Sequence, residues 1–339
     1  MTQIYTADEN RYGKMEYNRC GNSGIKLPII SLGFWHNFGV HNDFDNMRRM
    51  CFTAFDEGIT HFDLADNYGP YPGSAEENFG RILAKDLKPY RDELIISTKA
   101  GYEMWDGPYG NWGSKKHLVA GLDQSLLRMG CDYVDIFYHH RMDRETPLEE
   151  TMEALNGIVK SGKALYIGVS NYDQEYTGKA IKMLRELKCP FIINQRRYSI
   201  FDRTIEEDGV KDYAYENGIG VIVFSPLAQG LLTDKYLHGI PSDSRIARDP
   251  RFLKADSLTK ERLSQIEALN EIAKERGQSL AQMALAWTVK DGRICSALIG
   301  ASSPEQIKEN AAGIVNHTFT EEEIRQIDQI SCGTSPRFT

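Results

Sequence analysis

Four side chains that can handle protons and charge stand at or just beyond the ends of short apolar segments. Asp63 and Lys99 close two such segments, His140 follows a third, and Tyr68 comes five residues after Asp63. A phenol normally titrates near pH 10, and a neighbouring ammonium group favours its ionised form. Lys99 can supply that ammonium, held in place by Asp63, while His140 can donate a hydrogen bond toward a substrate oxygen. The set predicts an acid that protonates a developing alkoxide at neutral pH.

Further polar residues follow three later segments of the same kind. Ser170 and Asn171 end one, Asn194 and Gln195 end the next, and a third ends in Phe224-Ser225-Pro226. The alternative is that each of these polar residues is simply a solvated loop residue. In the same way, Tyr68 or a lone histidine can be a structural residue that packs in the core. Polar ends on successive strands that face one basin instead indicate an active site.

The sequence lacks the usual glycine-rich phosphate motifs. Gly218-Ile-Gly220 enters a strand and has no third glycine, so a dinucleotide fold of the Rossmann type is not supported, and no Walker A motif is present. Barrels often bind phosphate instead near their last two strands, at a helix N-terminus. Ser303, Pro304 and Gln306 have the types and spacing of an N-cap, a first helical residue and a capping box. These three residues alone prove only the start of a helix.

A long connection, residues 225–257, adds Lys235 and Arg245, and an arginine can grip a phosphate through two parallel hydrogen bonds. The pair His139-His140 has no further ligand at metal-binding spacing, so we expect no catalytic metal. The aromatic residues of the loop 101–113 line a substrate pocket or only cover the barrel mouth, and Trp35 is the better candidate for a pocket wall; the loop residues are Trp105, Tyr109 and Trp112.

These residues need a scaffold that brings strand ends together, and the chain alternates short β-rich segments with longer amphipathic ones. The eight predicted strands are residues 29–34, 59–64, 94–99, 133–139, 164–170, 191–195, 219–224 and 294–299. The predicted helices are residues 45–57, 75–84, 116–128, 148–159, 175–187, 205–216, two within 259–290, 304–313 and 320–330.

Eight such units without a break predict an α/β fold, a closed (β/α)8 TIM barrel forming a single domain over residues 1–339. A doubly wound open sheet is the alternative. A β-hairpin at 15–19 and 25–27 is expected before the barrel, after a polar N-terminal extension (1–14), and an extra helix at the C-terminal end.

Composition narrows the class of protein. The net charge of −8 argues against a nucleic-acid partner. Six scattered cysteines without a Cys-x-x-Cys pair favour a reducing compartment over a disulfide scaffold or a zinc site. The N-terminus lacks the apolar core of a signal peptide, and no run approaches the roughly 18 apolar residues of a membrane span. We expect a cytoplasmic protein.

Read in order, these motifs resemble the aldo-keto reductase superfamily over nearly the whole chain. The resemblance rests on LGFW (32–35), GITHFDLADNYG (58–69), ISTK (96–99), YVDIFYHHR (133–141), GKALYIGVSN (162–171), FSPLAQGLL (224–232), IPSDSR (240–245) and LIGASSPEQIKEN (298–310). Within the superfamily, the chain is similar to the branch that contains bacterial L-glyceraldehyde-3-phosphate reductases and the β subunits of voltage-gated potassium channels.

The resemblance implies a role for each matched residue. Tyr68 would be the general acid, tuned by Lys99 and Asp63, and His140 would orient the substrate carbonyl, with Trp35 beside substrate and cofactor. NADP(H) would be the cofactor, preferred over NAD because of Arg245 and the polar set after the last strand. Its implied contacts are Trp35, Asp63, Ser170, Asn171, Gln195, Phe224, Ser225, Pro226, Leu227, Gln229, Gly230, Lys235, Arg245, Gly300, Ser302, Gln306, Glu309 and Asn310.

Two departures from the family pattern bear on the cofactor. Phe224 stands where many members carry tyrosine or tryptophan, so it keeps a stacking face and loses a polar group. Asp234 replaces a glycine common before the lysine-tyrosine pair, which puts a negative charge beside Lys235.

The implied activity is reduction of short aldehydes, such as glyceraldehyde 3-phosphate or methylglyoxal, by a homo-oligomer (tetramer or octamer). The alternative is a cofactor-binding regulatory module similar to the channel β subunits, whose slow chemistry reports redox state. A barrel isomerase or hydrolase without nicotinamide is not supported by the motifs after the seventh and eighth strands.

Overall fold

The computed structural model describes residues 5–69, 71–242, 244–249, 251 and 253–331. The first four residues of the predicted polar extension and the tail at 332–339 lie outside this range. Within the described residues, no helix is both long enough and apolar enough to cross a membrane.

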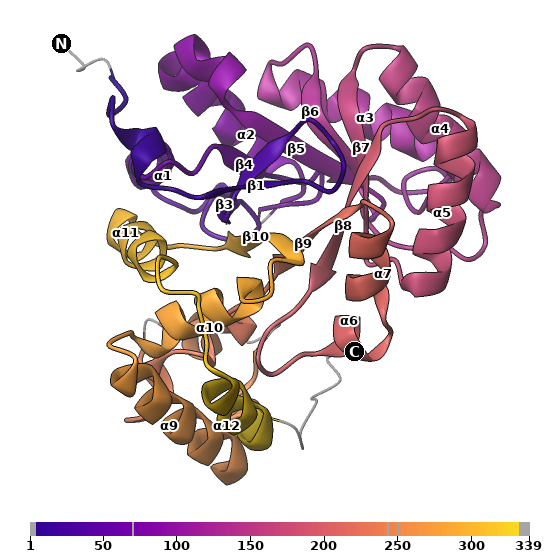
Figure 1. The fold of residues 1–339 in the computed structure, drawn as a ribbon. Coiled ribbons are helices and arrows are strands. Elements are labelled where there is room, and N and C mark those ends of the chain that lie inside the picture. Colours follow the sequence, from indigo (N-terminus) through magenta and orange to yellow (C-terminus); the bar gives the residue numbers. More distant parts are fainter. Residues whose placement is uncertain (1–4, 70, 243, 250, 252, 332–339) are drawn as a thin grey trace.

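Eight parallel strands form a closed barrel at the centre of the molecule (Figure 1). The last strand pairs with both the first and the seventh, so the barrel has no sheet edge and the open-sheet alternative is excluded. All eight predicted strands are confirmed, and they are β3 (Ile30–Gly33), β4 (His61–Asp63), β5 (Ile95–Ala100), β6 (Val134–His139), β7 (Ala164–Ser170), β8 (Phe191–Arg197), β9 (Gly220–Phe224) and β10 (Ile294–Ile299).

Helices surround the barrel, and several begin at a residue whose side chain caps the first turn. Asp43, Ser114 and Asp173 accept hydrogen bonds from the backbone of the first turns of α1, α3 and α5, which satisfies N–H groups that a helix start leaves free. The first group of helices is α1 (Phe44–Asp56), α2 (Ser74–Ile82), α3 (Lys115–Met129), α4 (Leu148–Lys160) and α5 (Gln174–Glu186). The remaining helices are α6 (Thr204–Glu207), α7 (Val210–Glu216), α8 (Arg245–Arg248), α9 (Lys260–Glu275), α10 (Leu280–Val289), α11 (Pro304–Gly313) and α12 (Glu321–Ser331).

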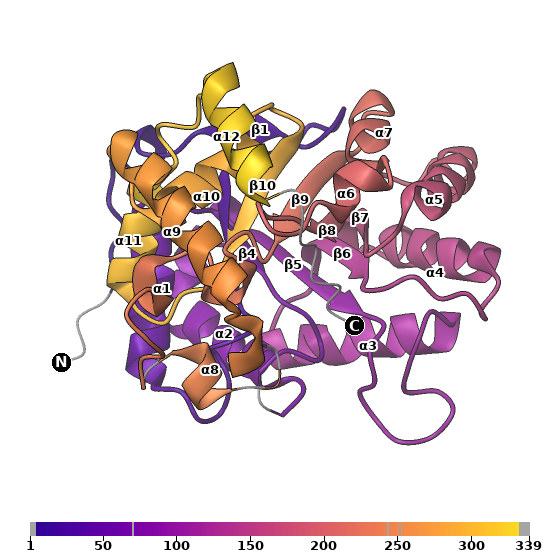
Figure 2. The same ribbon diagram turned by 90° about the horizontal axis from the view of Figure 1, so that it is seen from below.

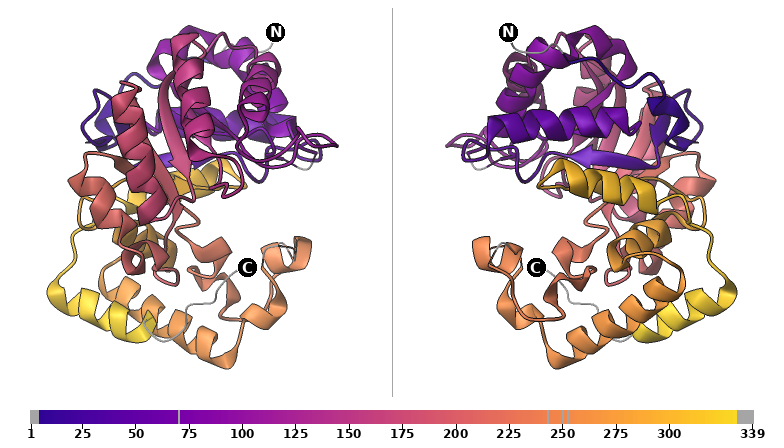
Figure 3. Two further views of the ribbon diagram at one scale, coloured as in Figure 1. Left: turned by 90° about the vertical axis from the view of Figure 1, so that its right-hand side faces the viewer. Right: turned by 90° about the vertical axis from the view of Figure 1, so that its left-hand side faces the viewer.

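Two helix predictions need correction. The single helix expected at 205–216 is divided into α6 and α7, because Gly209 between them has a left-handed backbone (φ 74°) that ends one helix and begins the next. The helix expected at 75–84 continues beyond α2 as a π-helical turn, Leu83–Leu87. The expected break near Gly277 and the extra C-terminal helix are confirmed as the gap between α9 and α10 and as α12, which packs beside α9 (Figure 3).

The predicted hairpin is present as β1 (Tyr17–Arg19) and β2 (Lys26–Pro28), and it covers the amino-terminal end of the barrel. Cys20 and Leu27 are fully buried in a cluster with barrel-strand residues that include Ile192, Ile222 and Cys295, and the Asn22 backbone amide donates to the Gly218 carbonyl at 2.8 Å. This end is therefore closed by packing. The opposite, carboxyl end carries the long loops, including the connection from β5 to α3 that projects from the barrel (Figure 2).

Replacing Gly80 by alanine tests how tightly α2 packs on α3. A Cβ atom at Gly80 would lie 2.4 Å from the Arg128 carbonyl oxygen, which is backbone and moves only with its helix. We expect a loss of about 1–3 kcal/mol in the free energy of unfolding, measured by urea denaturation. The matched control is Gly157→Ala in α4, where nothing lies within 4 Å, and we expect a gain of about 0.5–1 kcal/mol there. Equal effects at both positions would contradict close packing of the two helices.

Candidate active site

The predicted chemical residues meet at the carboxyl end of the barrel because each lies at the end of a neighbouring strand. Asp63 ends β4, Lys99 is the penultimate residue of β5, and His140 directly follows β6. The strand register places Asp63 opposite Ser97 and Lys99 opposite Tyr138. The strands therefore determine which side chains can touch, as predicted for a barrel.

Lys99 is fully buried and uses all three of its N–H donors. Its Nζ atom donates to Asp63 Oδ2 at 2.5 Å, to the Leu64 carbonyl at 2.6 Å and to the Tyr68 hydroxyl at 3.3 Å. Burial lowers the pKa of Lys99, and the Asp63 carboxylate opposes that change. Because the Tyr68 oxygen accepts from Lys99, the proton of the phenol is left to point elsewhere.

The pKa of Tyr68 departs from the sequence-based expectation. Burial raises the pKa of Tyr68 well above its ordinary value of 10, and the Asp63 charge raises it further. The expected lowering of this pKa by Lys99 is therefore not supported. A protonated phenol is what a proton donor requires, so the acid role expected for this residue stays compatible with the geometry.

His140 places a neutral ring beside the Tyr68 phenol. The centres of the two rings are 5.7 Å apart, and the Tyr102 ring lies edge-on to His140 at 4.7 Å. Burial first, then the charges of Lys99 and Arg141, hold the pKa of His140 well below 6.5. Its Nδ1 atom is buried without a hydrogen-bond partner among the described residues, so the ring has unused hydrogen-bonding capacity beside the phenol.

The neighbouring His139 has a structural environment. It is fully buried, and its Nδ1 atom shares a 2.7 Å hydrogen bond with the Tyr172 hydroxyl. Among the described residues, no group of three histidine, cysteine, aspartate or glutamate side chains is arranged to hold a metal ion.

A buried chain of hydrogen bonds beneath Asp63 was missed by sequence reasoning. Ser97 donates to Asp63 Oδ1 at 2.7 Å, and its oxygen lies 2.9 Å from His61 Nε2. On the far side of the ring, His61 Nδ1 lies 2.9 Å from Ser31, which is 2.6 Å from Ser296. Since the Ser97 hydroxyl donates its proton to the carboxylate, His61 Nε2 must donate to the Ser97 oxygen. Every hydrogen bond in this series is therefore donated in the direction of Asp63.

The sequence contained a signal for this series of hydrogen bonds. Ser31, His61, Ser97 and Ser296 interrupt segments that are otherwise apolar on both faces, as buried parallel strands are. A polar side chain at such a position needs a partner, and only the barrel shows that the four partners are one another.

Burial of His61 and His139 predicts a loss of stability in acid. Burial lowers the pKa of His61 to about 4 and that of His139 to about 3. Below about pH 6.5 the two histidines are therefore protonated in the unfolded state while they stay neutral in the folded state. Stability should therefore fall as the pH drops from 6.5 to 5, by about 2 kcal/mol for each histidine. Urea unfolding at several pH values measures the dependence of the free energy of unfolding on pH. In His61→Gln, the number of protons taken up on unfolding in this range should fall by about one. An unchanged slope in the variant would contradict a neutral His61.

Three of the expected cofactor contacts, Ser170, Asn171 and Gln195, lie together. The Ser170 hydroxyl donates to the Gln195 carbonyl at 3.0 Å, and Asn171 Nδ2 donates to the Ser170 hydroxyl at 3.2 Å and to the His140 carbonyl at 3.1 Å. Gln195 Nε2 donates to Asp63 Oδ1 at 3.1 Å. These amide and hydroxyl groups therefore adjoin the Lys99–Asp63 pair directly.

After β9 the backbone takes an unusual path. Ser225, Ala228 and Gln229 all have positive φ angles (57°, 48° and 62°), which cost free energy for residues other than glycine and cluster at functional sites. Gln229 Nε2 donates to the Ser225 hydroxyl at 3.1 Å, and Arg245 Nη1 donates to Gln229 Oε1. Arg245 is thus placed over the same turn, with one nitrogen already engaged.

The segment after β10 begins α11 with Ser303 as its N-cap and Pro304 in the first turn, as predicted. The capping box expected from Gln306 is wrong, because its Oε1 atom accepts from the Ser302 amide at 2.8 Å and from the Ser302 hydroxyl at 3.1 Å instead. Gln306 therefore ties the loop to the helix one residue earlier. Gln306, Glu309 and Asn310 are three and four residues apart, which places them on one side of α11.

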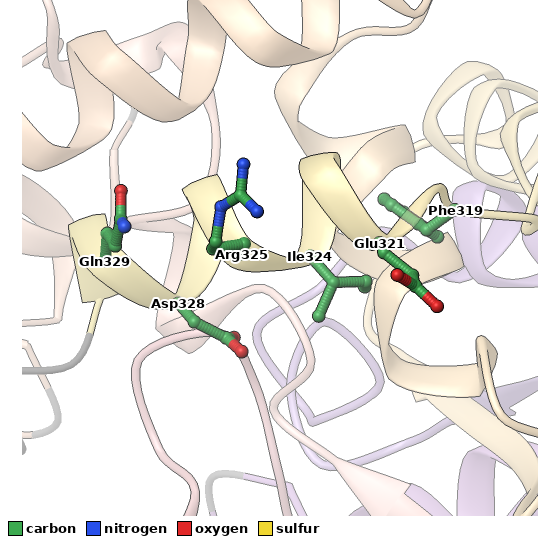
Figure 4. A pocket seen from close by; sticks show the side chains of 6 residues that line it. All are labelled: Phe319, Glu321, Ile324, Arg325, Asp328 and Gln329. Atoms are coloured by element: carbon green, nitrogen blue, oxygen red, sulfur yellow. The ribbon is translucent and has the colours of Figure 1, made fainter.

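A surface pocket elsewhere does not involve these residues. It follows α12 and is lined by Phe319, Glu321, Ile324, Arg325, Asp328 and Gln329 (Figure 4). None of the strand-end residues contributes to it, so this pocket is separate from the candidate active site.

Comparisons with known proteins agree with this geometry. The model of the aldo/keto reductase family matches residues 29–331. The chain is 56% identical to L-glyceraldehyde 3-phosphate reductase of Escherichia coli (strain K12) over 329 residues, 96% of this chain and 95% of that protein. It is 35% identical to a probable voltage-gated potassium channel subunit beta of Oryza sativa subsp. japonica (93% and 96% covered) and 37% identical to one of Arabidopsis thaliana (88% and 91%). The chain is therefore a member of the aldo/keto reductase family, and an oxidoreductase.

Proposed function

We propose that this chain reduces short aldehydes to alcohols with NADPH, and that Tyr68 donates the proton. The observation that carries the proposal is the use of all three Lys99 donors, which leaves the proton of a protonated phenol free for a substrate. The unpartnered ring nitrogen of His140 offers a second polar contact for the carbonyl oxygen. Together the two side chains would hold a carbonyl oxygen where charge develops on it.

The side chains at the barrel mouth would hold the dinucleotide in an extended form. Amide and hydroxyl groups gather at the Asp63 end, and cationic and amide groups follow at the turn after β9 and at the start of α11. NADPH bound there would supply the hydride, and the protein would supply orientation and electrostatics. The proposed contacts are Trp35, Asp63, Ser170, Asn171, Gln195, Phe224, Ser225, Pro226, Leu227, Gln229, Gly230, Lys235, Arg245, Gly300, Ser302, Gln306, Glu309 and Asn310.

Glyceraldehyde 3-phosphate and methylglyoxal are the proposed substrates. The first is supported by the name of the Escherichia coli relative, which matches nearly the full length of the chain. Trp35, two residues beyond β3, would form part of the pocket wall with Tyr68 and His140.

A steady-state assay tests the proposal directly. Purified protein is mixed with NADPH and a panel of short aldehydes that includes both proposed substrates, with NADH as the control cofactor. Rapid NADPH consumption with one aldehyde, and slow consumption with NADH, is the expected result. Tight NADPH binding without turnover of any aldehyde would contradict the reductase and favour a regulatory module, the class to which the plant relatives' names point.

A further inference from the structure

We propose that Arg141 is the anion-binding part of the substrate site, and that it selects short aldehydes carrying a phosphate or carboxylate group over neutral ones. The inference rests on the proposed function, because it assigns the far end of the aldehyde whose carbonyl faces Tyr68 and His140.

Arg141 is the residue after His140, and the Tyr102 ring connects the two side chains. The guanidinium carbon of Arg141 lies 4.2 Å from the centre of the Tyr102 ring, and that centre lies 4.7 Å from the centre of the His140 ring. The two distances placed end to end put the guanidinium carbon within 8.9 Å of the His140 ring. The cation is therefore at the edge of the candidate active site.

The guanidinium is held rigidly by neutral groups. It stacks on the Trp112 ring at 3.5 Å as well as on Tyr102, and it donates from Nε to the Gly101 carbonyl at 2.9 Å and from Nη2 to Asn111 Oδ1 at 2.6 Å. Stacking and hydrogen bonds of this kind orient a guanidinium without neutralising it. The Nη1 atom makes no hydrogen bond to any described residue.

The charge of Arg141 is not paired within the described part of the chain, where no carboxylate lies within 4.0 Å of it. Asp143 is close enough to act on Arg141, but its two oxygens accept from the backbone amides of Gly113 (3.0 Å), Glu145 (2.9 Å) and Thr146 (3.3 Å). Partial burial lowers the pKa of Arg141, yet an arginine stays charged at neutral pH. A half-buried, unpaired cation that is already oriented is suited to bind an anion.

The reach matches an aldehyde with an anionic end. In glyceraldehyde 3-phosphate the carbonyl oxygen and the phosphorus are five bonds apart, which spans about 6 Å for bonds of about 1.5 Å. With its carbonyl oxygen at Tyr68 and His140, the phosphate can contact Arg141 Nη1. Glyceraldehyde shares every other group and lacks this contact, so the two compounds form a matched pair.

The test compares kcat/KM for that pair in the wild type and in two variants. In Arg141→Gln, we expect the preference for glyceraldehyde 3-phosphate over glyceraldehyde to fall about 10- to 100-fold, chiefly through KM, since a charged hydrogen bond is lost. Arg141→Lys keeps the charge and loses the stacking plane, so its preference should be intermediate. The control is Arg144→Gln, because Arg144 is exposed and paired with Asp173, and its preference should match the wild type. The same comparison of kcat/KM for succinic semialdehyde and butyraldehyde shows whether Arg141 binds a carboxylate as well as a phosphate.

An equal loss for both compounds in Arg141→Gln, or an unchanged preference, would overturn the inference and leave Arg141 as a support for the loop. Failure of the proposed function is recognised separately, as absence of turnover by the wild type with any aldehyde. In that case, calorimetric titration with glycerol 3-phosphate still decides the matter. Binding at least about 10-fold weaker in Arg141→Gln than in the wild type would support the anion site, and equal binding would refute it.

Discussion

Tyr68→Phe is expected to lower kcat by at least about 10²-fold, because the substitution removes the only proton that the phenol can give. The ring remains and still packs beside His140 and Lys99, so the fold and NADPH binding should be retained. The measurement combines steady-state kinetics with a fluorescence titration of NADPH. A loss of turnover without a loss of binding separates proton donation from a structural role of the ring.

The control for this experiment is Tyr215→Phe, which removes an exposed phenol at the end of α7 and should leave kcat unchanged. Intact turnover by Tyr68→Phe would show that another group donates the proton. His140 would then be the first candidate, since its ring centre lies 5.7 Å from that of Tyr68 and its Nδ1 atom has no hydrogen-bond partner among the described residues.

Lys99→Met is expected to abolish activity and to reduce the free energy of unfolding by about 3–5 kcal/mol. Asp63 and Lys99 form an ion pair with both side chains almost fully buried, and removing one partner leaves an uncompensated buried charge. The Leu64 carbonyl and the Tyr68 hydroxyl also lose a donor. Urea unfolding measures the change, and far-ultraviolet circular dichroism shows whether the variant folds.

The double variant Asp63→Asn/Lys99→Met distinguishes charge from packing. It removes both charges, so it should recover part of the stability that Lys99→Met loses, while activity stays absent. If the double variant is no more stable than Lys99→Met, the cost comes from packing or from the hydrogen bonds to Leu64 and Tyr68. A double variant that turns over aldehyde would contradict the role of the pair in catalysis.

The hydrogen-bond chain below Asp63 bears on both experiments. Ser97 and Gln195 each donate to Asp63 Oδ1, and His61 supports Ser97 from below. The Asp63 carboxylate is therefore oriented by Ser97 and Gln195 through Oδ1, while its Oδ2 atom accepts from Lys99. Because Lys99 in turn bonds to Tyr68, the orientation of the proposed acid depends on residues deep inside the barrel.

The strands and the chemical residues at their ends were predictable from the amino-acid sequence. Apolar segments of four to eight residues alternate with amphipathic ones, and this pattern depends only on local periodicity. Asp63, Lys99, His140 and Ser170 follow from it, because a barrel places the carboxyl ends of its strands at one mouth. The start of α11 at Ser303 and Pro304 was predictable for the same reason, because it depends on neighbouring residues alone.

Where sequence reasoning failed, the decisive contact was not local. Gln306 has the spacing of a capping box, but its side chain bonds to Ser302, since the loop after β10 brings that amide closer. The helix at 205–216 is periodic throughout, and the left-handed backbone at Gly209 divides it nonetheless. In both cases a single competing conformation outweighed a pattern that spans several residues.

The sequence by itself determined the order of elements and the residue types at the strand ends, because periodicity and strand ends are properties of the chain. The pairing of β10 with β3, which closes the barrel, is a long-range contact that the structure decided. Only the tertiary structure decided the electrostatics. The pKa of Tyr68 rises instead of falling because burial and then the Asp63 charge raise it, and burial depends on every element packed around the ring. Likewise, the unpaired charge of Arg141 emerges only when the loop folds Tyr102, Asn111 and Trp112 around it, since those contacts join residues about 30 to 40 positions apart.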